Sequence, residues 1–326
     1  MNTTRRIALA ALILFGNTVA SVALAQSEYP AKPIKLIVPF PAGGGTDIIA
    51  RHIGNKMNDV PGWKTIIENV AGAGGNIGLA AAAKASADGL TLVLGQTSNL
   101  AIAPALYAKV SYDPIKDFAP VTLVTSVPIT FMVAADSPYK TLADLVRAAK
   151  AKPGEITFAT SGNGTVAHLA TEMFKRTAGI DMLHIPYKGA AAAFPDLIGG
   201  RVSVFVSSLE TGIPQIKSKT VRALAVTSIA RASSVPDVPT FQELGYKSID
   251  ALTWFGVLAP AGTPEAIITR LNAEITKILR MPDVQEKFAA TSGGEIKTGP
   301  TEFAALLKTE LTKWASVVKE SGAKVD

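Results

Sequence analysis

The sequence has 326 residues, no cysteine and a formal net charge of +6 from 32 basic and 26 acidic residues. Without cysteine the chain forms no disulfide, offers no thiolate to a metal, and has no cysteine nucleophile or N-terminal lipid anchor. The small positive excess is spread along the chain without a Lys/Arg cluster, so it gives no support to nucleic-acid binding and suits small anionic partners.

The first 25 residues have the pattern of a secretory signal peptide. A basic start, MNTTRR, precedes the apolar run IALAALILF, and small residues at positions 23 and 25 predict cleavage after Ala25. The polar stretch at 16–18 interrupts the run well short of the roughly 20 apolar residues that a membrane span needs. We expect an exported, soluble, periplasmic chain that begins near Gln26, and the pair Arg5-Arg6 leaves both the general and the twin-arginine export routes open.

Short apolar segments alternate with stretches of helical spacing along the rest of the chain. The predicted strands cover residues 34–38, 65–69, 91–95, 155–160, 182–187, 202–207 and 221–227. Repeated strand–helix–strand units are typical of parallel sheets that helices cover on both faces. We therefore expect an α/β protein, and a length of about 300 residues after cleavage predicts two domains.

One apolar segment is long enough to pass from one domain to the other. Residues 119–134 exceed the length of an ordinary strand and contain Pro128. The strand predicted at 221–227 would bring the chain back. This connection predicts a discontinuous lobe 1, formed by residues 26–124 and 228–326, and a lobe 2 formed by residues 125–227.

Three helices have clear start or stop signals. Thr141 and Asp144 form a capping box at the start of the first helix. The second is expected to have Thr263 as its N-cap and Pro264 in its first turn. The third begins near residue 301 and ends before Gly322. The apolar stripes of the second and third helices predict packing against the core.

The segment PFPAGGGTDIIAR, residues 39–51, connects a predicted strand to a predicted helix. The free N–H groups and the dipole of a helix start favour an anion, and glycines let a ligand approach the backbone closely. A phosphate-binding loop would need Lys-Ser/Thr where Thr46-Asp47 stands, and Asp47 would repel a phosphate. A carboxylate fits better. The alternative is a tight turn without a ligand, and the motif alone does not decide between the two.

The same arrangement recurs in FATSGNGTVAHLATEMF, residues 158–174, and in NVAGAGGNIG, residues 69–78. Gly162, Gly164 and Ala167 satisfy a G-x-G-x-x-A dinucleotide fingerprint, but the next predicted strand ends in Tyr187-Lys188 instead of the acidic residue that holds a ribose. Ligands bind parallel sheets at the carboxyl ends of their strands. If each lobe contributes its own loop, the loops face one another across a cleft.

The sequence has few candidates for catalysis or metal binding. It contains neither G-x-S-x-G nor H-E-x-x-H. His168 and Glu172 stand one helical turn apart, but two ligands do not make a metal site, and His52 and His184 have no partner visible in the sequence. We therefore expect no enzymatic activity, no metal and no cofactor. An exported enzyme acting on carboxylic acids or esters is retained as an alternative.

Several blocks of the sequence, in order, resemble Bug-type extracytoplasmic solute receptors of the tripartite tricarboxylate transporter system. They include YPAKPIKLIVPFPAGGGTDIIAR, ENVAGAGGNIG, FATSGNGTVAHLATEMF, HIPYKGAAAAFPDLIGGRV, VRALAVTSIARASSVPDVPTFQELG and WFGVLAPAGTPEAIITRLN. The resemblance covers nearly the whole chain after the signal peptide.

This resemblance implies a type II periplasmic binding protein fold, in which two crossing strands join two α/β lobes and a carboxylate is clamped in the cleft. It implies a monomeric receptor that delivers a small carboxylate to the permease subunits of a tripartite tricarboxylate transporter. An exported sensor that passes its ligand state to a signalling partner is the alternative. The resemblance names the ligand class and leaves the individual carboxylate open.

The resemblance also assigns the residues that hold the ligand, largely through backbone N–H groups. Loop 1, residues 41–47, holds the carboxylate from lobe 1, and loop 2, residues 160–165, holds it from lobe 2. The candidate ligand-binding residues are Phe40, Ala42, Gly43, Gly44, Thr46, Asp47, Asn76, Thr97, Ser98, Thr160, Ser161, Gly162, Gly164, Thr165, His168, Tyr187, Lys188 and Ser207.

Overall fold

The computed structural model describes residues 29–289, 299–323 and 325. The predicted signal peptide and its cleavage site lie outside the described residues. No helix in the described ranges is both long enough and apolar enough to cross a membrane.

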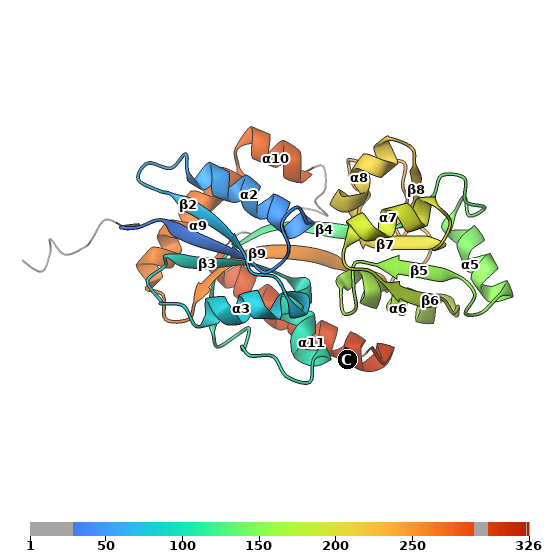
Figure 1. The fold of residues 1–326 in the computed structure, drawn as a ribbon, viewed down its shortest axis with the longest axis horizontal. Coiled ribbons are helices and arrows are strands. Elements are labelled where there is room, and N and C mark those ends of the chain that lie inside the picture. Colours follow the sequence, from blue (N-terminus) through green and yellow to red (C-terminus); the bar gives the residue numbers. More distant parts are fainter. Residues whose placement is uncertain (1–28, 290–298, 324, 326) are drawn as a thin grey trace, which may run out of the picture.

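The strands form one continuous, nine-stranded arrangement in the order β2-β1-β3-β9-β4-β7-β5-β6, with β8 paired to β4. Figure 1 shows two halves side by side, which we call sheet A and sheet B. Sheet A contains β1 (Ile34–Val38), β2 (Thr65–Asn69), β3 (Thr91–Gln96) and β9 (Leu252–Pro260); sheet B contains β5 (Thr157–Thr160), β6 (Leu183–Pro186), β7 (Val204–Ser208) and β8 (Val221–Val226). We call sheet A with its helices lobe 1, and sheet B with its helices lobe 2.

Strand β4 (Phe118–Ala134) belongs to both sheets. It pairs with β9 from Phe118 to Pro128, and from Ile129 onward it pairs with β7 and β8. The expectation of a long crossing strand is therefore confirmed, and the change of partner falls directly after the proline. Because Pro has no N–H to donate, this position suits the boundary between two ladders.

The chain returns to lobe 1 by a different route from the one predicted. Strand β8 lies entirely in sheet B, antiparallel to β4. The return runs through residues 227–251 and leads into β9. The two crossings are joined where they meet, because Ile129 N–H donates to Thr227 Oγ1 at 2.9 Å and Thr227 N–H donates to the Ile129 carbonyl at 3.0 Å.

Helices cover both faces of each sheet, as Figure 1 shows. In lobe 1, α2 (Gly45–Met57), α9 (Glu265–Leu279) and α10 (Pro282–Ala289) cover one face, and α3 (Asn76–Ala83), α4 (Ala103–Leu106) and α11 (Pro300–Ser321) cover the other. Lobe 2 has α5 (Leu142–Ala151), α6 (Val166–Ala178), α7 (Ala190–Ile198) and α8 (Leu209–Lys217). One buried cluster, which includes Trp314, Phe131 and Phe174, continues from lobe 1 into lobe 2.

The helix signals were right in two cases out of three. Thr141 and Asp144 form the predicted capping box of α5, and Gly322 ends α11 in the left-handed conformation at φ 66°. Thr263 is not the N-cap of α9, which is Pro264. The Thr263 hydroxyl donates instead to the Pro260 carbonyl at 2.8 Å, so it stabilises the turn after β9.

Candidate functional site

Loop 1 is organised by the carboxylate of Asp47, which is 2 % exposed. One carboxylate oxygen accepts hydrogen bonds from Gly43 N–H and Arg51 Nε, both at 2.8 Å. The other accepts one from Asn69 Nδ2 at 2.9 Å. Burial acts to raise the pKa of Asp47, but the hydrogen bonds from Arg51, Gly43 and Asn69 outweigh it and hold the pKa below its ordinary value. Asp47 is therefore ionised at neutral pH, and its carboxylate holds loop 1 in place through these hydrogen bonds.

The residues directly before α2 are exposed, and the helix start has no side-chain cap. Gly44 is its N-cap, in extended conformation, and no side chain caps it. Residues 41–44 are exposed, and Gly43 has a positive φ of 80° with no heavy atom within 4 Å of the position a Cβ would take. A helix start without a side-chain cap offers its N–H groups to a ligand.

Two further loops of lobe 1, one at Gly75 and Asn76 and the other at Asn99, lie next to Phe40, directly before loop 1. A Cβ on Gly75 would stand 2.6 Å from Asn99 Nδ2 and 3.1 Å from the Phe40 ring. Asn76 begins α3, and its Oδ1 accepts a hydrogen bond from Tyr112 Oη at 2.8 Å. Asn99, which the sequence reading missed, is fully buried, and its Nδ2 has no hydrogen-bond partner in the described part of the chain.

Loop 2 is held by hydroxyl groups and one imidazole. Thr165 caps α6, accepting from His168 N–H at 3.2 Å and donating to the Gly162 carbonyl at 3.0 Å. Gly164 N–H donates to His168 Nδ1 at 3.2 Å, and Thr160 Oγ1 donates to the Gly162 carbonyl at 3.0 Å. Gly162 and Gly164 have φ values of 140° and 70°, which non-glycine residues rarely adopt. The loop is therefore built from local bonds that need these residue types.

His168 is paired with His184, a partner that the sequence did not indicate. The two rings stack with centroids 4.0 Å apart, and His184 Nε2 lies 2.7 Å from Thr160 Oγ1. Burial and the nearby charge of Lys175 lower the pKa of His168 to about 4. Burial, His168 and Lys175 lower the pKa of His184 to about 3. Both imidazoles are therefore neutral at pH 7.

The pairing of His168 with Glu172 that the helical spacing allowed does not form. Glu172 makes an ion pair with Lys175 at 3.1 Å instead. Among the described residues, no group of three or more His, Cys, Asp or Glu side chains is placed to hold a metal ion.

The two lobes touch at both glycine-rich loops. Glu210, the second residue of α8 in lobe 2, places its Oε1 2.9 Å from the position of a Cβ on Gly45, the first residue of α2. A Cβ on Gly164 in loop 2 would collide with Leu106 of α4 in lobe 1. Loops 1 and 2 are therefore brought to the junction between the lobes, and Glu210 is a residue of this junction that the sequence reading missed.

Several other candidate side chains are engaged within the fold. Thr97 Oγ1 accepts from Trp254 N–H at 2.9 Å and therefore holds β9. Tyr187 Oη donates to Asp196 at 2.6 Å, and Ser207 Oγ lies 3.2 Å from the Thr211 hydroxyl. Among the remaining candidates, Ser98 and Ser161 are half-buried, Thr46 is buried, and Ala42 and Lys188 are exposed.

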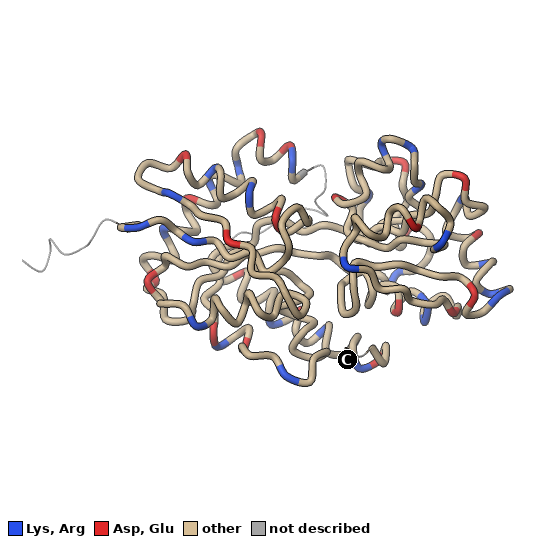
Figure 2. The backbone as a smooth tube through the Cα atoms, in the orientation of Figure 1, with Lys and Arg blue, Asp and Glu red and all other residues tan. Residues whose placement is uncertain are grey.

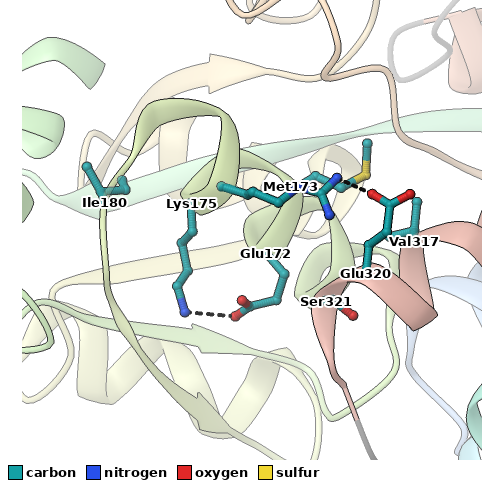
Figure 3. Close-up of a pocket in the computed structure, with 8 residues that line it drawn as sticks. Glu172, Met173, Lys175, Ile180, Val317, Glu320 and Ser321 are labelled. Carbon is teal, nitrogen blue, oxygen red and sulfur yellow. Dashed lines mark hydrogen bonds and ion pairs between the residues drawn. The ribbon is translucent and has the colours of Figure 1, made fainter.

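A separate pocket of about 210 Å³ lies between α6 and α11, which come from different lobes. Its charged side chains are already paired: Lys175 with Glu172, as Figure 3 shows, and Arg176 with Glu320. We therefore do not place the ligand there. Figure 2 shows basic and acidic residues distributed over both lobes.

Two lobes that share crossing segments, with glycine-rich helix starts at their junction, have the architecture of a solute-binding protein. The family model described as tripartite tricarboxylate transporter family receptor matches residues 49–323, and the chain belongs to this family. It is 39% identical to protein BugT of Bordetella pertussis, with 100% of each chain covered.

Solved structures agree with this assignment. The periplasmic binding protein BugD matches with a TM-score of 0.82 at 35% identity, covering 91% of this chain and 99% of that chain. Rpa4515 of R. palustris, solved with adipate, matches with a TM-score of 0.85 at 33% identity, covering 91% of this chain and 100% of that chain. The expected fold class, a two-lobed periplasmic binding protein, is confirmed.

Proposed function

We propose that this protein is a periplasmic receptor that captures a small carboxylate between loop 1 and loop 2 and delivers it to the permease of a tripartite tricarboxylate transporter. The observation that carries the proposal is that each glycine-rich helix start touches the opposite lobe: the start of α2 lies against Glu210 of lobe 2, and the loop before α6 lies against Leu106 of lobe 1. Each helix start favours negative charge, so a carboxylate between them is stabilised from both sides.

Backbone N–H groups supply most of the binding energy in this proposal. A hydrogen bond to a charged group contributes about 1.5–3 kcal/mol. Four or five such bonds, less the cost of ordering the ligand and the lobes, leave about 8 kcal/mol, which corresponds to a dissociation constant in the micromolar range. That affinity suits a receptor that must release its ligand to a permease. The adipate in the structure of Rpa4515 supports the choice of a carboxylate.

The lobes close on the ligand about the joined crossings at Ile129 and Thr227. Neither lobe alone completes the site, because loop 1 belongs to lobe 1 and loop 2 to lobe 2. We expect the protein to act as a monomer without a metal or cofactor, and we expect its role to be binding and not catalysis.

A thermal-shift screen against mono-, di- and tricarboxylates and amino acids tests the proposal. A ligand that binds only the folded protein raises the melting temperature by mass action. Small-angle scattering with the best compound should then show a smaller radius of gyration. The proposal fails if no carboxylate shifts the melting temperature, or if a binding carboxylate is chemically converted. Mass spectrometry of periplasmic extract checks that the mature chain begins at Gln26.

A further inference from the structure

Glu210 is an acidic side chain at the place where the lobes meet. It stands in the first turn of α8, directly after the strand end at Ser208. Its Oε1 lies 2.9 Å from the position a Cβ on Gly45 would take. The carboxyl group of lobe 2 therefore reaches across the junction to the helix start that, under the proposed function, receives the carboxylate of the ligand.

The carboxyl group of Glu210 is only partly hydrogen-bonded. Oε2 is buried and has no hydrogen-bond partner in the described part of the chain. None of the ion pairs among the described residues gives Glu210 a cation. Burial raises the pKa of Glu210 to about 7, against the opposing effect of hydrogen bonds from its own N–H and from Ser208.

A buried carboxylate oxygen without a partner costs free energy, and the loss is avoided when a donor from elsewhere reaches it. We propose that Glu210 is a specificity-determining residue that pairs with a cationic nitrogen of the ligand, so that the protein selects ammonium carboxylates over dicarboxylates. This inference rests on the proposed function, since it assumes that the ligand carboxylate lies on loop 1.

The charges near the site favour this class of ligand. Asp47 already carries a negative charge beneath loop 1, and its partners Arg51 and Asn69 are engaged. A dicarboxylate would bring a second negative charge close to Glu210, and like charges at a few ångströms disfavour the ionised pair. A ligand ammonium group removes this repulsion and supplies the N–H donor that Oε2 lacks.

Isothermal titration with matched ligands tests the inference. One set is 4-aminobutyrate, valerate and glutarate, in which a methyl or a carboxylate group replaces the ammonium group. A second set is β-alanine, butyrate and succinate, and the tightest compound of the thermal-shift screen is added. The variant is Glu210→Gln, which keeps the shape and removes the charge. Glu265→Gln is the matched control, because Glu265 also stands in the first turn of a helix but is exposed.

We expect the tightest ligand to carry a cationic nitrogen, and we expect Glu210→Gln to weaken its binding at least tenfold. The same variant should tighten binding of the matched dicarboxylate, whereas Glu265→Gln should change neither. The inference is overturned if the tightest ligand has no cationic nitrogen, or if Glu210→Gln leaves the ratio of affinities unchanged. Failure of every compound to bind the wild-type protein would instead count against the proposed function itself.

Discussion

The imidazole of His184 lies flat on that of His168, with an angle of 13° between the rings, and the ring of Phe158 also stacks on His184 with centroids 4.7 Å apart. The pair joins β6 to the helix that begins at loop 2. Because His168 Nδ1 accepts a hydrogen bond from Gly164 N–H, that nitrogen must be unprotonated for the loop to keep its form. The conformation of loop 2 thus depends on a neutral His168.

The histidine pair predicts a stability that falls with acid. The native pKa values are about 4 for His168 and about 3 for His184, whereas the unfolded chain has the ordinary value of about 6.5. The unfolded state therefore binds more protons below pH 6.5. The full stability is present above that pH, and it falls by up to about 1.4 kcal/mol per pH unit for each histidine between pH 6 and 4. Urea unfolding at several pH values measures this slope.

The variant His184→Phe separates the contribution of His184 to the pH dependence of stability from the contributions of other titratable groups. Phenylalanine keeps an aromatic ring in the stack but cannot take up a proton. We plot the free energy of unfolding against pH. Between pH 6.5 and 5, we expect the slope for the variant to correspond to about one proton fewer taken up on unfolding than in wild type. Equal slopes in the two proteins would show that the pair does not control the acid sensitivity.

Loop 1 should lose its ligand when Gly43 is replaced by valine. Gly43 has a φ of 80°, and no heavy atom lies within 4 Å of the position a Cβ would take, so a side chain there enters open space on the approach to the helix start. The strained φ itself costs about 1–2 kcal/mol. We expect Gly43→Val to fold with this loss and to show no binding by titration calorimetry.

Gly62 is the matched control, because it has a φ of 79° and equally open surroundings in the loop between α2 and β2. Gly62→Val should lose the same stability and bind normally. If both variants bind alike, the backbone of loop 1 does not hold the ligand.

Asp47→Asn tests whether the buried carboxylate organises loop 1. The amide cannot accept all the hydrogen bonds from Gly43, Arg51 and Asn69, so at least one donor loses its partner. We expect a loss of about 1–3 kcal/mol in the free energy of unfolding, together with weaker ligand binding. Asp144→Asn, which weakens the exposed capping box of α5, should reduce stability alone. Unchanged affinity in Asp47→Asn would contradict the supporting role.

Thr227→Val should weaken the connection between the crossings. The Thr227 hydroxyl is buried, accepts from Ile129 N–H at 2.9 Å and donates to the Ala251 carbonyl at 2.5 Å. Valine has the same shape but leaves both groups unpaired, which costs about 1–3 kcal/mol. Thr227→Ser keeps the hydroxyl and should stay close to wild type in chemical denaturation. A Thr227→Val protein as stable as wild type would contradict this expectation.

The sequence predicted most strands because their apolar runs are bounded by turn residues. Strands β1 and β2 agree with the predicted limits to the residue, and β4 differs by one residue. Strand β9 was missed. Its core, Trp254-Phe255-Gly256, has no alternation, and Gly256 is required because a Cβ there would collide with Phe303 of α11. Such a contact between residues far apart in sequence leaves no local signal.

The glycine-rich loops were visible in the sequence because their chemistry is local. The capping by Thr165 and the positive φ values of Gly43 and Gly162 follow from residue type and spacing. The histidine stack and the position of Glu210 were not visible. Both depend on which strands are neighbours in the sheet. No single segment of the sequence indicates that order, β7-β5-β6.

The chain enters the sheet of lobe 2 at Ile129 and leaves it after Val226, and Ile129 and Thr227 are hydrogen-bonded to each other, although Phe241 of the returning segment still packs on Phe131 and Phe174. When the two ends of an inserted domain lie side by side, another domain can replace it without moving the rest of the chain. Residues 130–226 of a relative, spliced at these two positions, would meet the same α2 helix start. Under the proposed function, the insert would then bring its own loop 2, while loop 1 would remain that of the host. Recombination between receptors of this kind therefore offers new combinations of specificity, without the need to evolve a new cleft.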